Sequence, residues 1–191
     1  MSQAVDHSRL TLDAQHAAFL ESPFLAMPIA GTIAWAAIGV AGALLPLKLA
    51  AWAVFIGTGS IFYLGLAVAR FTGEDLLGRR HKGNYFDRLF FHSVAMAVLV
   101  YSIAIPFFWA EPTSLPMSVG ILAGLMWIPF SALVGHWIGW FHAISRTIFV
   151  VIAWYAFPRQ RFVIIPAIIV VVYLITIAIL VRRARARLSV G

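Results

Sequence analysis

The chain lacks cysteine and has few charged residues. Of its 191 residues, 11% are charged and 62% are hydrophobic. The absence of cysteine excludes disulfides, thiolate metal sites, cysteine nucleophiles and covalently attached c-type haem. Soluble domains carry about 25% charged residues. A chain with a mean hydropathy of +0.94 therefore has too much apolar surface for water, and we expect a lipid bilayer to be its solvent.

Several further signals are missing. The first 27 residues carry acidic side chains at Asp6, Asp13 and Glu21 ahead of the first apolar run, so we expect no secretory signal peptide. No Gly-x-Ser-x-Gly motif, Ser-His-Asp order, phosphate-binding loop or lipidation motif occurs. We interpret residues 1–27 as a polar tail, in which residues 11–21 form either a short interfacial helix or a disordered segment.

Apolar segments occupy most of the rest of the chain. Each is close to the roughly 20 residues that cross a bilayer, and prolines punctuate the run at Pro46, Pro112, Pro116 and Pro158. We predict an all-α integral membrane bundle of six transmembrane helices over residues 28–181, followed by a basic tail over residues 182–191. We expect the last segment, rich in Ile and Val, to be peripheral and lipid-facing. The segments are 28–45, 49–71, 86–110, 117–134, 138–157 and 162–181.

The distribution of Lys and Arg predicts the orientation. Ten of the fourteen fall in the N-terminal tail, the connections on the same side and the C-terminal tail, whereas Lys48, Arg159 and Arg161 fall on the other side. Because cytoplasmic segments carry the excess of Lys and Arg, we predict that both termini are cytoplasmic. The net charge of +7 then indicates contacts with anionic lipid head groups rather than with nucleic acid.

Arg146 is the one basic residue that lies inside an apolar segment, and it is the main candidate functional residue. His142 precedes it by four residues, as Arg88 precedes His92 in the third segment. Residues spaced by four lie on one face of a helix, and ionisable residues at membrane depth usually face the bundle interior. We therefore predict a polar pocket near the cytoplasmic side, with ligand-binding residues Arg146, His142, His92, His136, Asp87 and Arg88.

Arginine presents a fork of donors that suits carboxylate or phosphate, and histidine can exchange a proton near neutral pH. The first hypothesis is a module that binds or transports a small anionic amphiphile or metabolite. The alternatives are a lipid-modifying transferase or hydrolase with histidine as general base, and a non-catalytic accessory or scaffold subunit. In that last case Arg146 would pair internally with Asp87, Glu74 or Asp75. A separate alternative is that Arg146 extends to lipid head groups. The sequence leaves open whether the protein is an enzyme and whether it forms a homo-oligomer.

The histidines allow two cofactor alternatives. His92 and His142 at similar depth could ligate a b-type haem, which is the alternative to our expectation of no cofactor. His92, His136, His142 and Asp87 could form a zinc set, but they lack the HExxH spacing, and we predict no metal.

Within residues 84–180, three runs carry a family resemblance: Thr113 to Ser131, Gly135-His136-Trp137, and Phe141 to Thr147. This region resembles a bacterial family of small multi-span membrane proteins of unknown function. The resemblance implies location in a bacterial inner membrane, and it implies no activity for any residue.

Overall fold

The protein is a bundle of membrane-spanning helices. The computed structural model describes residues 7–78 and 82–188, and this part contains helices and no strand. Six helical stretches are long and apolar enough to cross a membrane, which confirms the predicted all-α fold and the number of spans. They are α2 (Ala26–Leu44), α3 (Leu47–Thr72), α4–α5 (Tyr85–Leu99 and Tyr101–Ala110), η2–α6–α7 (Pro112–Ser114, Leu115–Gly124 and Trp127–Val134), α8 (Ile138–Ala156) and α9 (Arg161–Leu188).

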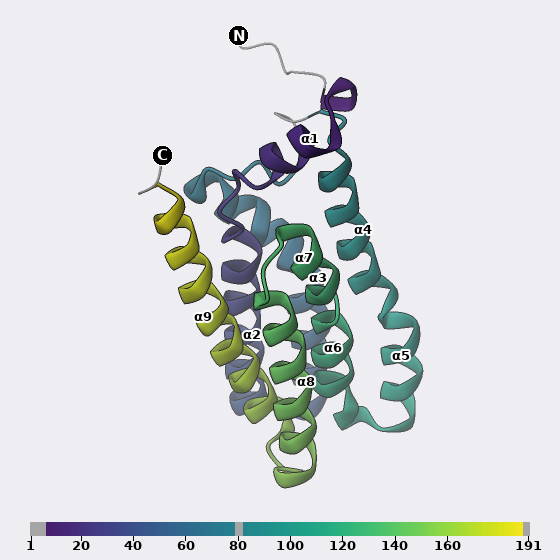
Figure 1. The fold of residues 1–191 in the computed structure, drawn as a ribbon. Coiled ribbons are helices and arrows are strands. Elements are labelled where there is room, and N and C mark those ends of the chain that lie inside the picture. Colours follow the sequence, from purple (N-terminus) through teal and green to yellow (C-terminus); the bar gives the residue numbers. More distant parts are fainter. Residues whose placement is uncertain (1–6, 79–81, 189–191) are drawn as a thin grey trace.

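Both ends of the described chain lie at one end of the bundle. The N-terminal elements η1 (His7–Arg9) and α1 (Leu12–Phe19) lie there, as does the last part of α9 (Figure 1). We term this the α1 end, and the opposite end, where residues 157–160 join α8 to α9, the far end. An even number of spans requires this arrangement.

Two of the spans are divided, and each contains a proline. The third span divides at Val100 and contains Pro106, while the fourth divides at Leu125 and Met126, just before Pro129. A proline has no N–H for the carbonyl four residues earlier, and its ring clashes with that turn. In the fourth span that carbonyl belongs to Leu125, which lies at the break.

The fourth and fifth spans are joined by a tight turn, which lies in the gap between the predicted segments 117–134 and 138–157. Gly135 ends α7 with a left-handed φ of 62°, a conformation that glycine adopts without a Cβ penalty. His136 N donates to Ser131 O at 3.1 Å and closes the helix. Gly139 then packs so closely on Trp127 O and Ser131 that a Cβ there would clash with both. The start of α8 is thereby held against the break in the fourth span.

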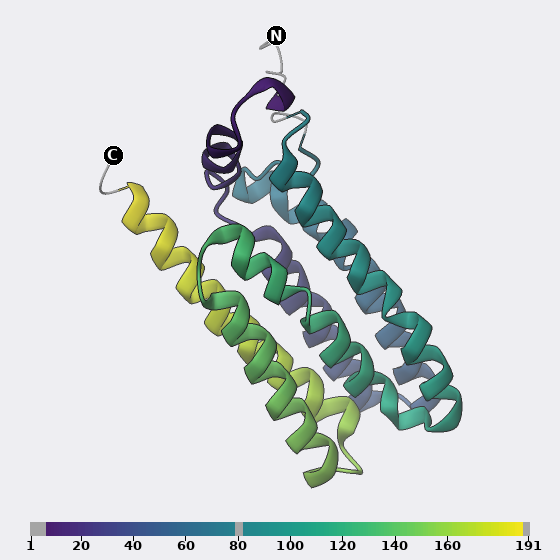
Figure 2. The same cartoon turned by 45° about the vertical axis from the view of Figure 1, so that its right-hand side comes forward.

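The last span has one buried face and one exposed face, so our expectation of a lipid-facing helix is correct for one face alone. α9 packs against α2, α6 and α8, and Ile165, Ile169 and Tyr173 of its buried face are in the core. Figure 2 shows α8 and α9 along one side of the bundle and α4 and α5 along the other, with α6 and α7 between them. The apolar residues of α9 therefore serve both faces, since Val171, Leu174 and Ile175 are exposed. The outer positions belong to α3 and α4–α5, whose spans are the least buried.

α1 docks on the bundle rather than extending from it. Thr11 caps it by accepting from Ala14 N at 3.3 Å. Asn84 Nδ2 donates to Gln15 O at 2.8 Å, Tyr85 N donates to Gln15 Oε1 at 2.8 Å, and His16 Nε2 donates to Leu133 O at 2.8 Å. The polar N-terminal segment is thus attached to α4 and α7, across the α1 end (Figure 1).

Candidate functional site

Arg146 lies in the interior of the bundle. It is 1% exposed and His142 is fully buried, on the one face of α8 that points inward. The spacing of four residues places both side chains on that face. This confirms that Arg146 faces inward rather than extending to lipid head groups.

A chain of hydrogen bonds orients His142. The Thr176 hydroxyl donates to Val172 O at 2.8 Å, as hydroxyls in helices often do. Thr176 Oγ1 therefore accepts from His142 Nδ1 at 2.9 Å, and this assigns the ring proton to Nδ1. His142 Nε2 is then the acceptor that faces Arg146 Nη1 at 3.4 Å. Both ring nitrogens are engaged, and the bonding pattern is that of a neutral imidazole.

Aromatic rings surround the guanidinium. Its Cζ lies 5.4 Å from the ring centre of Trp35 and 5.5 Å from that of Tyr173. Trp127 stacks on His142 with ring centres 4.2 Å apart. On the remaining side is Gly124 of α6, where a Cβ would lie 2.9 Å from Arg146 Cδ. Aromatic faces attract cations, and more strongly where water is excluded.

The guanidinium lacks a carboxylate partner and is only partly hydrogen-bonded. Nη1 faces His142 Nε2 and donates to Tyr173 Oη at 3.3 Å. Within residues 7–78 and 82–188, Nε is buried without a hydrogen-bond partner, Nη2 donates no hydrogen bond, and no carboxylate pairs with the side chain. Nε and Nη2 form the side edge of the fork that binds carboxylate or phosphate through two parallel bonds. That edge is unused.

The acidic residues proposed as partners of Arg146 lie elsewhere, which corrects the internal ion-pair alternative. Glu74 Oε1 accepts from Leu25 N and Ala26 N at 2.8 Å each and so caps the start of α2. Burial raises the pKa of Glu74, although these two bonds and bonds from Thr72 and Ser22 oppose the rise. Asp75 and Asp87 line a cavity at the α1 end together with Glu74.

The structure does not gather the six predicted site residues in one pocket. Only His142 and Arg146 meet. His92 and Arg88 are exposed on α4, and Arg88 lies over the Tyr85 ring at 5.7 Å. His136 is half-buried in the α7–α8 turn, where its Nδ1 accepts from Ile138 N at 3.2 Å. Their binding roles stay predictions.

The haem alternative does not suit this geometry, because both nitrogens of His142 are engaged within the protein and His92 lies exposed on another helix. In the described part of the chain, no group of three or more His, Asp or Glu side chains is arranged to hold a metal ion.

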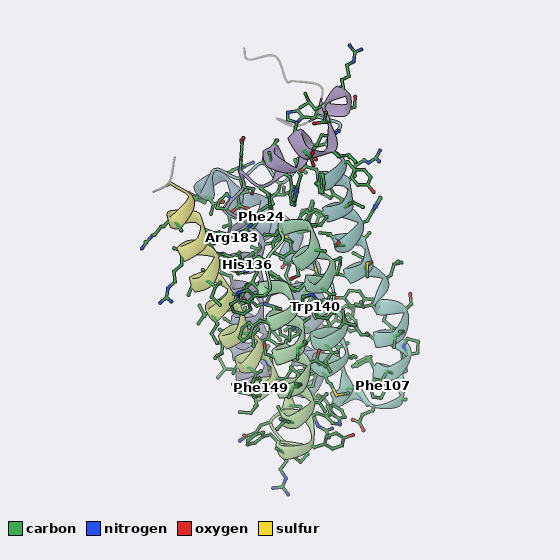
Figure 3. The ribbon with its side chains drawn as sticks, viewed as in Figure 1. Phe24, Phe107, His136, Trp140, Phe149 and Arg183 are labelled. Carbon is green, nitrogen blue, oxygen red and sulfur yellow. The ribbon has the colours of Figure 1, made fainter. Side chains whose placement is uncertain are left out.

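Two adjoining cavities lead inward from the α1 end. The outer cavity has a volume of about 220 Å³ and the inner one about 30 Å³. Both are lined by Phe24, Glu74, Leu76 and Phe90. The inner cavity is also lined by Trp127, whose ring stacks on His142. In Figure 3, Phe24 and Arg183 lie near the α1 end, while Phe149 and Phe107 lie toward the far end. The remaining lining residues of the outer cavity are Phe19, Glu21, Ser22, Pro23, Gly73, Asp75, Asp87 and Phe91.

Residues 17–183 match the family of unknown function DUF7010. The chain belongs to this family. No curated protein matches the chain, and neither does any solved structure. The match covers the first five spans and most of the sixth, so the Arg146 site lies within the family region. The function of the DUF7010 protein has to be argued from the site itself.

Sequence reasoning missed most of the surroundings of Arg146. Trp35 and Trp127 are two of seven tryptophans in an apolar chain, and nothing local distinguishes them from core residues. Tyr173 and Thr176 carried a usable signal, because they are hydroxyl groups three residues apart in a run of Ile and Val. That spacing places both on one helix face, and this face meets His142 and Arg146.

Proposed function

We propose that this DUF7010 protein is a multi-pass membrane protein that binds an anionic group, a carboxylate or a phosphate, at Arg146. The observation that carries the proposal is the buried guanidinium with its Nε–Nη2 edge unused and no carboxylate beside it. A charge in a membrane interior costs at least about 2.5–3.5 kcal/mol, so a ligand anion that completes its hydrogen bonds would bind favourably. An anionic amphiphile suits the setting, because its tail would remain in lipid.

The surroundings support a binding role for Arg146 rather than a catalytic one. Tyr173 and His142 hold Nη1 from one side, which orients the fork without using its side edge. The same bonds leave His142 without a free nitrogen to act as a general base. A lipid-modifying enzyme that uses His142 as its base would have to break one of these bonds first.

The test is retention of a defined anionic amphiphile. Native mass spectrometry of the purified protein would be carried out with oleate, with phosphatidylglycerol and with zwitterionic phosphatidylcholine. Arg146→Lys keeps the charge but removes the two-donor edge, so we expect about a tenfold or greater loss of anion retention. Arg185→Lys changes an exposed arginine of α9 at the α1 end and should retain the wild-type level. Equal retention by wild type and Arg146→Lys would contradict the proposal, and the two anionic probes distinguish a carboxylate from a phosphate ligand.

A structural role is the second candidate, and the cation–π contacts favour it. Trp35 and Tyr173 both lie within the roughly 6 Å over which an aromatic face attracts a cation. An accessory or scaffold subunit could use Arg146 to join α2, α8 and α9. In that case Arg146→Lys would lower the melting temperature while anion retention, if any, stayed unchanged.

We infer that the α1 end is cytoplasmic, in a bacterial inner membrane. The described basic side chains at that end include Arg70, Lys82, Arg88 and Arg182, against Lys48, Arg159 and Arg161 at the far end. The excess of Lys and Arg on one side supports this orientation, and the same residues would contact anionic head groups.

A further inference from the structure

The Arg146 site carries one fixed positive charge. An arginine side chain keeps its proton in proteins, and Arg146 is only 1% exposed, so water does little to compensate the charge. A buried charge without a partner costs free energy, and a second one costs it again. The net charge of the groups around Arg146 therefore decides which ligand charge the site can take.

Thr176 keeps His142 neutral. The Thr176 hydroxyl donates to Val172 O at 2.8 Å, so its oxygen accepts from His142 Nδ1 at 2.9 Å. The lone pair of Nε2 then faces Arg146 Nη1 at 3.4 Å. A proton on Nε2 would set two N–H groups against each other and would bring a second positive charge beside the first. The imidazole therefore stays neutral while Arg146 is charged.

The remaining neighbours add no charge. Tyr173 accepts from Arg146 Nη1 at 3.3 Å through its hydroxyl, which is a neutral group. Trp35 lies over the guanidinium and Trp127 stacks on His142, and both rings are uncharged. In the part of the chain that the structure describes, no Asp, Glu or Lys pairs with Arg146 or His142. The site as a whole therefore carries a single positive charge.

The unused edge of the guanidinium lies beside Gly124. A Cβ at Gly124 would lie 3.1 Å from Arg146 Nε, so α6 presents no side chain to this edge at that position. Carboxylates and phosphates match such an edge with two oxygens. A ligand head group bound there would meet one positive charge, the rings of Trp35 and Tyr173 and, among the described residues, no second cation.

We propose that the Arg146 site selects ligands with a single negative charge and rejects dianions. The inference rests on the proposed function and names the ligand class of that same site: carboxylates and phosphodiesters bind, whereas doubly ionised phosphomonoesters do not. One negative charge neutralises the guanidinium. A second would be buried without a partner, because His142 offers the ligand no proton while its Nδ1–H is bonded to Thr176 and its Nε2 faces Arg146.

Two phospholipids with the same acyl chains test the selectivity. Phosphatidylglycerol is a phosphodiester and carries one charge, whereas phosphatidic acid is a phosphomonoester, which loses its second proton at a pH of about 6. Native mass spectrometry of the purified protein would be carried out with each lipid at about pH 5 and about pH 8.5, on either side of that value. Site retention is the part of the signal that Arg146→Lys loses, so lipid held at the basic surface is not counted. Phosphatidylcholine is the zwitterionic control.

We expect site retention of phosphatidylglycerol to exceed that of phosphatidic acid by about tenfold or more at the higher pH. At the lower pH, where both lipids carry one charge, the two should be retained about equally, and phosphatidylglycerol should not change between the two conditions. Equal or better site retention of phosphatidic acid at the higher pH would overturn the charge selectivity and leave anion binding intact. Site retention of neither lipid would overturn the proposed function, and the selectivity with it.

The neutral state of His142 has a readout that involves no ligand. In protein labelled with nitrogen-15 histidine, the ring signals of His142 are those that disappear from the NMR spectrum in His142→Gln. We expect the pattern of the neutral Nδ1–H tautomer at both pH values, and a mixture of tautomers in Thr176→Val, which removes the acceptor for Nδ1. Thr176→Ser keeps the hydroxyl and should keep the wild-type pattern. Protonation of His142 at either pH, or an unchanged pattern in Thr176→Val, would contradict a site charge that Thr176 fixes.

Discussion

Tyr173 Oη lies 3.3 Å from Arg146 Nη1 and accepts its hydrogen bond, so the guanidinium is held by a neutral oxygen instead of a carboxylate. Its ring also lies 5.5 Å from Arg146 Cζ. Tyr173 is itself packed against Gly31, where a Cβ would lie 2.7 Å from Oη. The position of Arg146 therefore depends on α2 and α9 as well as on α8.

Tyr173→Phe should lower stability while keeping the cation–π contact. Hydrogen bonds to charged groups contribute about 1.5–3 kcal/mol, and the variant removes one such bond from a buried cation. We expect a lower melting temperature in detergent, measured by the loss of helical circular dichroism.

Tyr63→Phe is the matched control, because Tyr63 is 72% exposed on α3 and should tolerate the change. An equal fall in melting temperature for the two variants would contradict a specific role for the Tyr173 hydroxyl.

Gly124→Ala should displace Arg146. The added methyl group would lie 2.9 Å from Cδ and 3.1 Å from Nε, and overpacking of this kind costs about 1–3 kcal/mol. We expect lower thermal stability together with altered tryptophan fluorescence, since Trp35 and Trp127 lie beside the displaced groups.

Gly59→Ala is the comparison, because a Cβ at Gly59 meets nothing within 4 Å. It should be neutral or stabilising, by about 0.5–1 kcal/mol from helix propensity. Unchanged stability of Gly124→Ala would show that α6 moves away at little cost.

Glu74 should make stability depend on pH. Its pKa is raised above the ordinary value of 4.5, chiefly by burial, so the folded protein holds this proton more tightly than the unfolded chain does. The contribution of Glu74 is then fully present below the ordinary pKa and is lost as the pH rises through the folded value. The quantity to follow is the melting temperature of wild type minus that of Glu74→Gln. We expect this difference to decrease as the pH rises from 4.5 to neutral.

The glutamine oxygen of Glu74→Gln can still accept from Leu25 N and Ala26 N, whereas Glu74→Ala loses the cap, which is worth roughly 0.5–2 kcal/mol. Glu111, at the far end, is the opposite case. Hydrogen bonds from the Thr113 hydroxyl and N–H, and the charge of Arg161, lower its pKa, so its contribution is lost at acid pH instead. A flat difference between wild type and Glu74→Gln across the range would refute the role of Glu74 burial.

The two ends of the bundle should label from opposite sides of the membrane. Lys82→Cys lies at the α1 end and Arg159→Cys at the far end, and both positions are exposed. In intact bacterial cells, an impermeant maleimide should modify Arg159→Cys and should reach Lys82→Cys only after lysis. The reverse pattern would invert the proposed orientation, and equal labelling of both would contradict six spans.

The spans were predictable because each depends on a local property. Length, hydropathy and proline positions predicted all six, and the turn at Gly135 lies in the gap between the fourth and fifth predicted segments. The spacing of His142 and Arg146 likewise predicted a shared face. These inferences need no knowledge of which helices are neighbours.

The partners of Arg146 were not predictable in the same way. Trp35, Gly124 and Tyr173 come from three helices far apart in the sequence, and only the packing of α2, α6 and α9 brings them to Arg146. Hydropathy also did not reveal the buried face of α9, because buried and lipid-facing positions are both rich in Ile and Val. In a bilayer, apolar composition does not distinguish the inside of a protein from its outside.

The docking of α1 has a consequence for biosynthesis. Gln15 is bonded to residues 69 and 70 positions later, and His16 to one 117 positions later. The ribosome therefore produces this short helix well before its attachment points, because two spans precede Asn84 and Leu133 lies at the end of the fourth span. α1 therefore docks at the α1 end late in assembly, although α1 is among the first segments to be made.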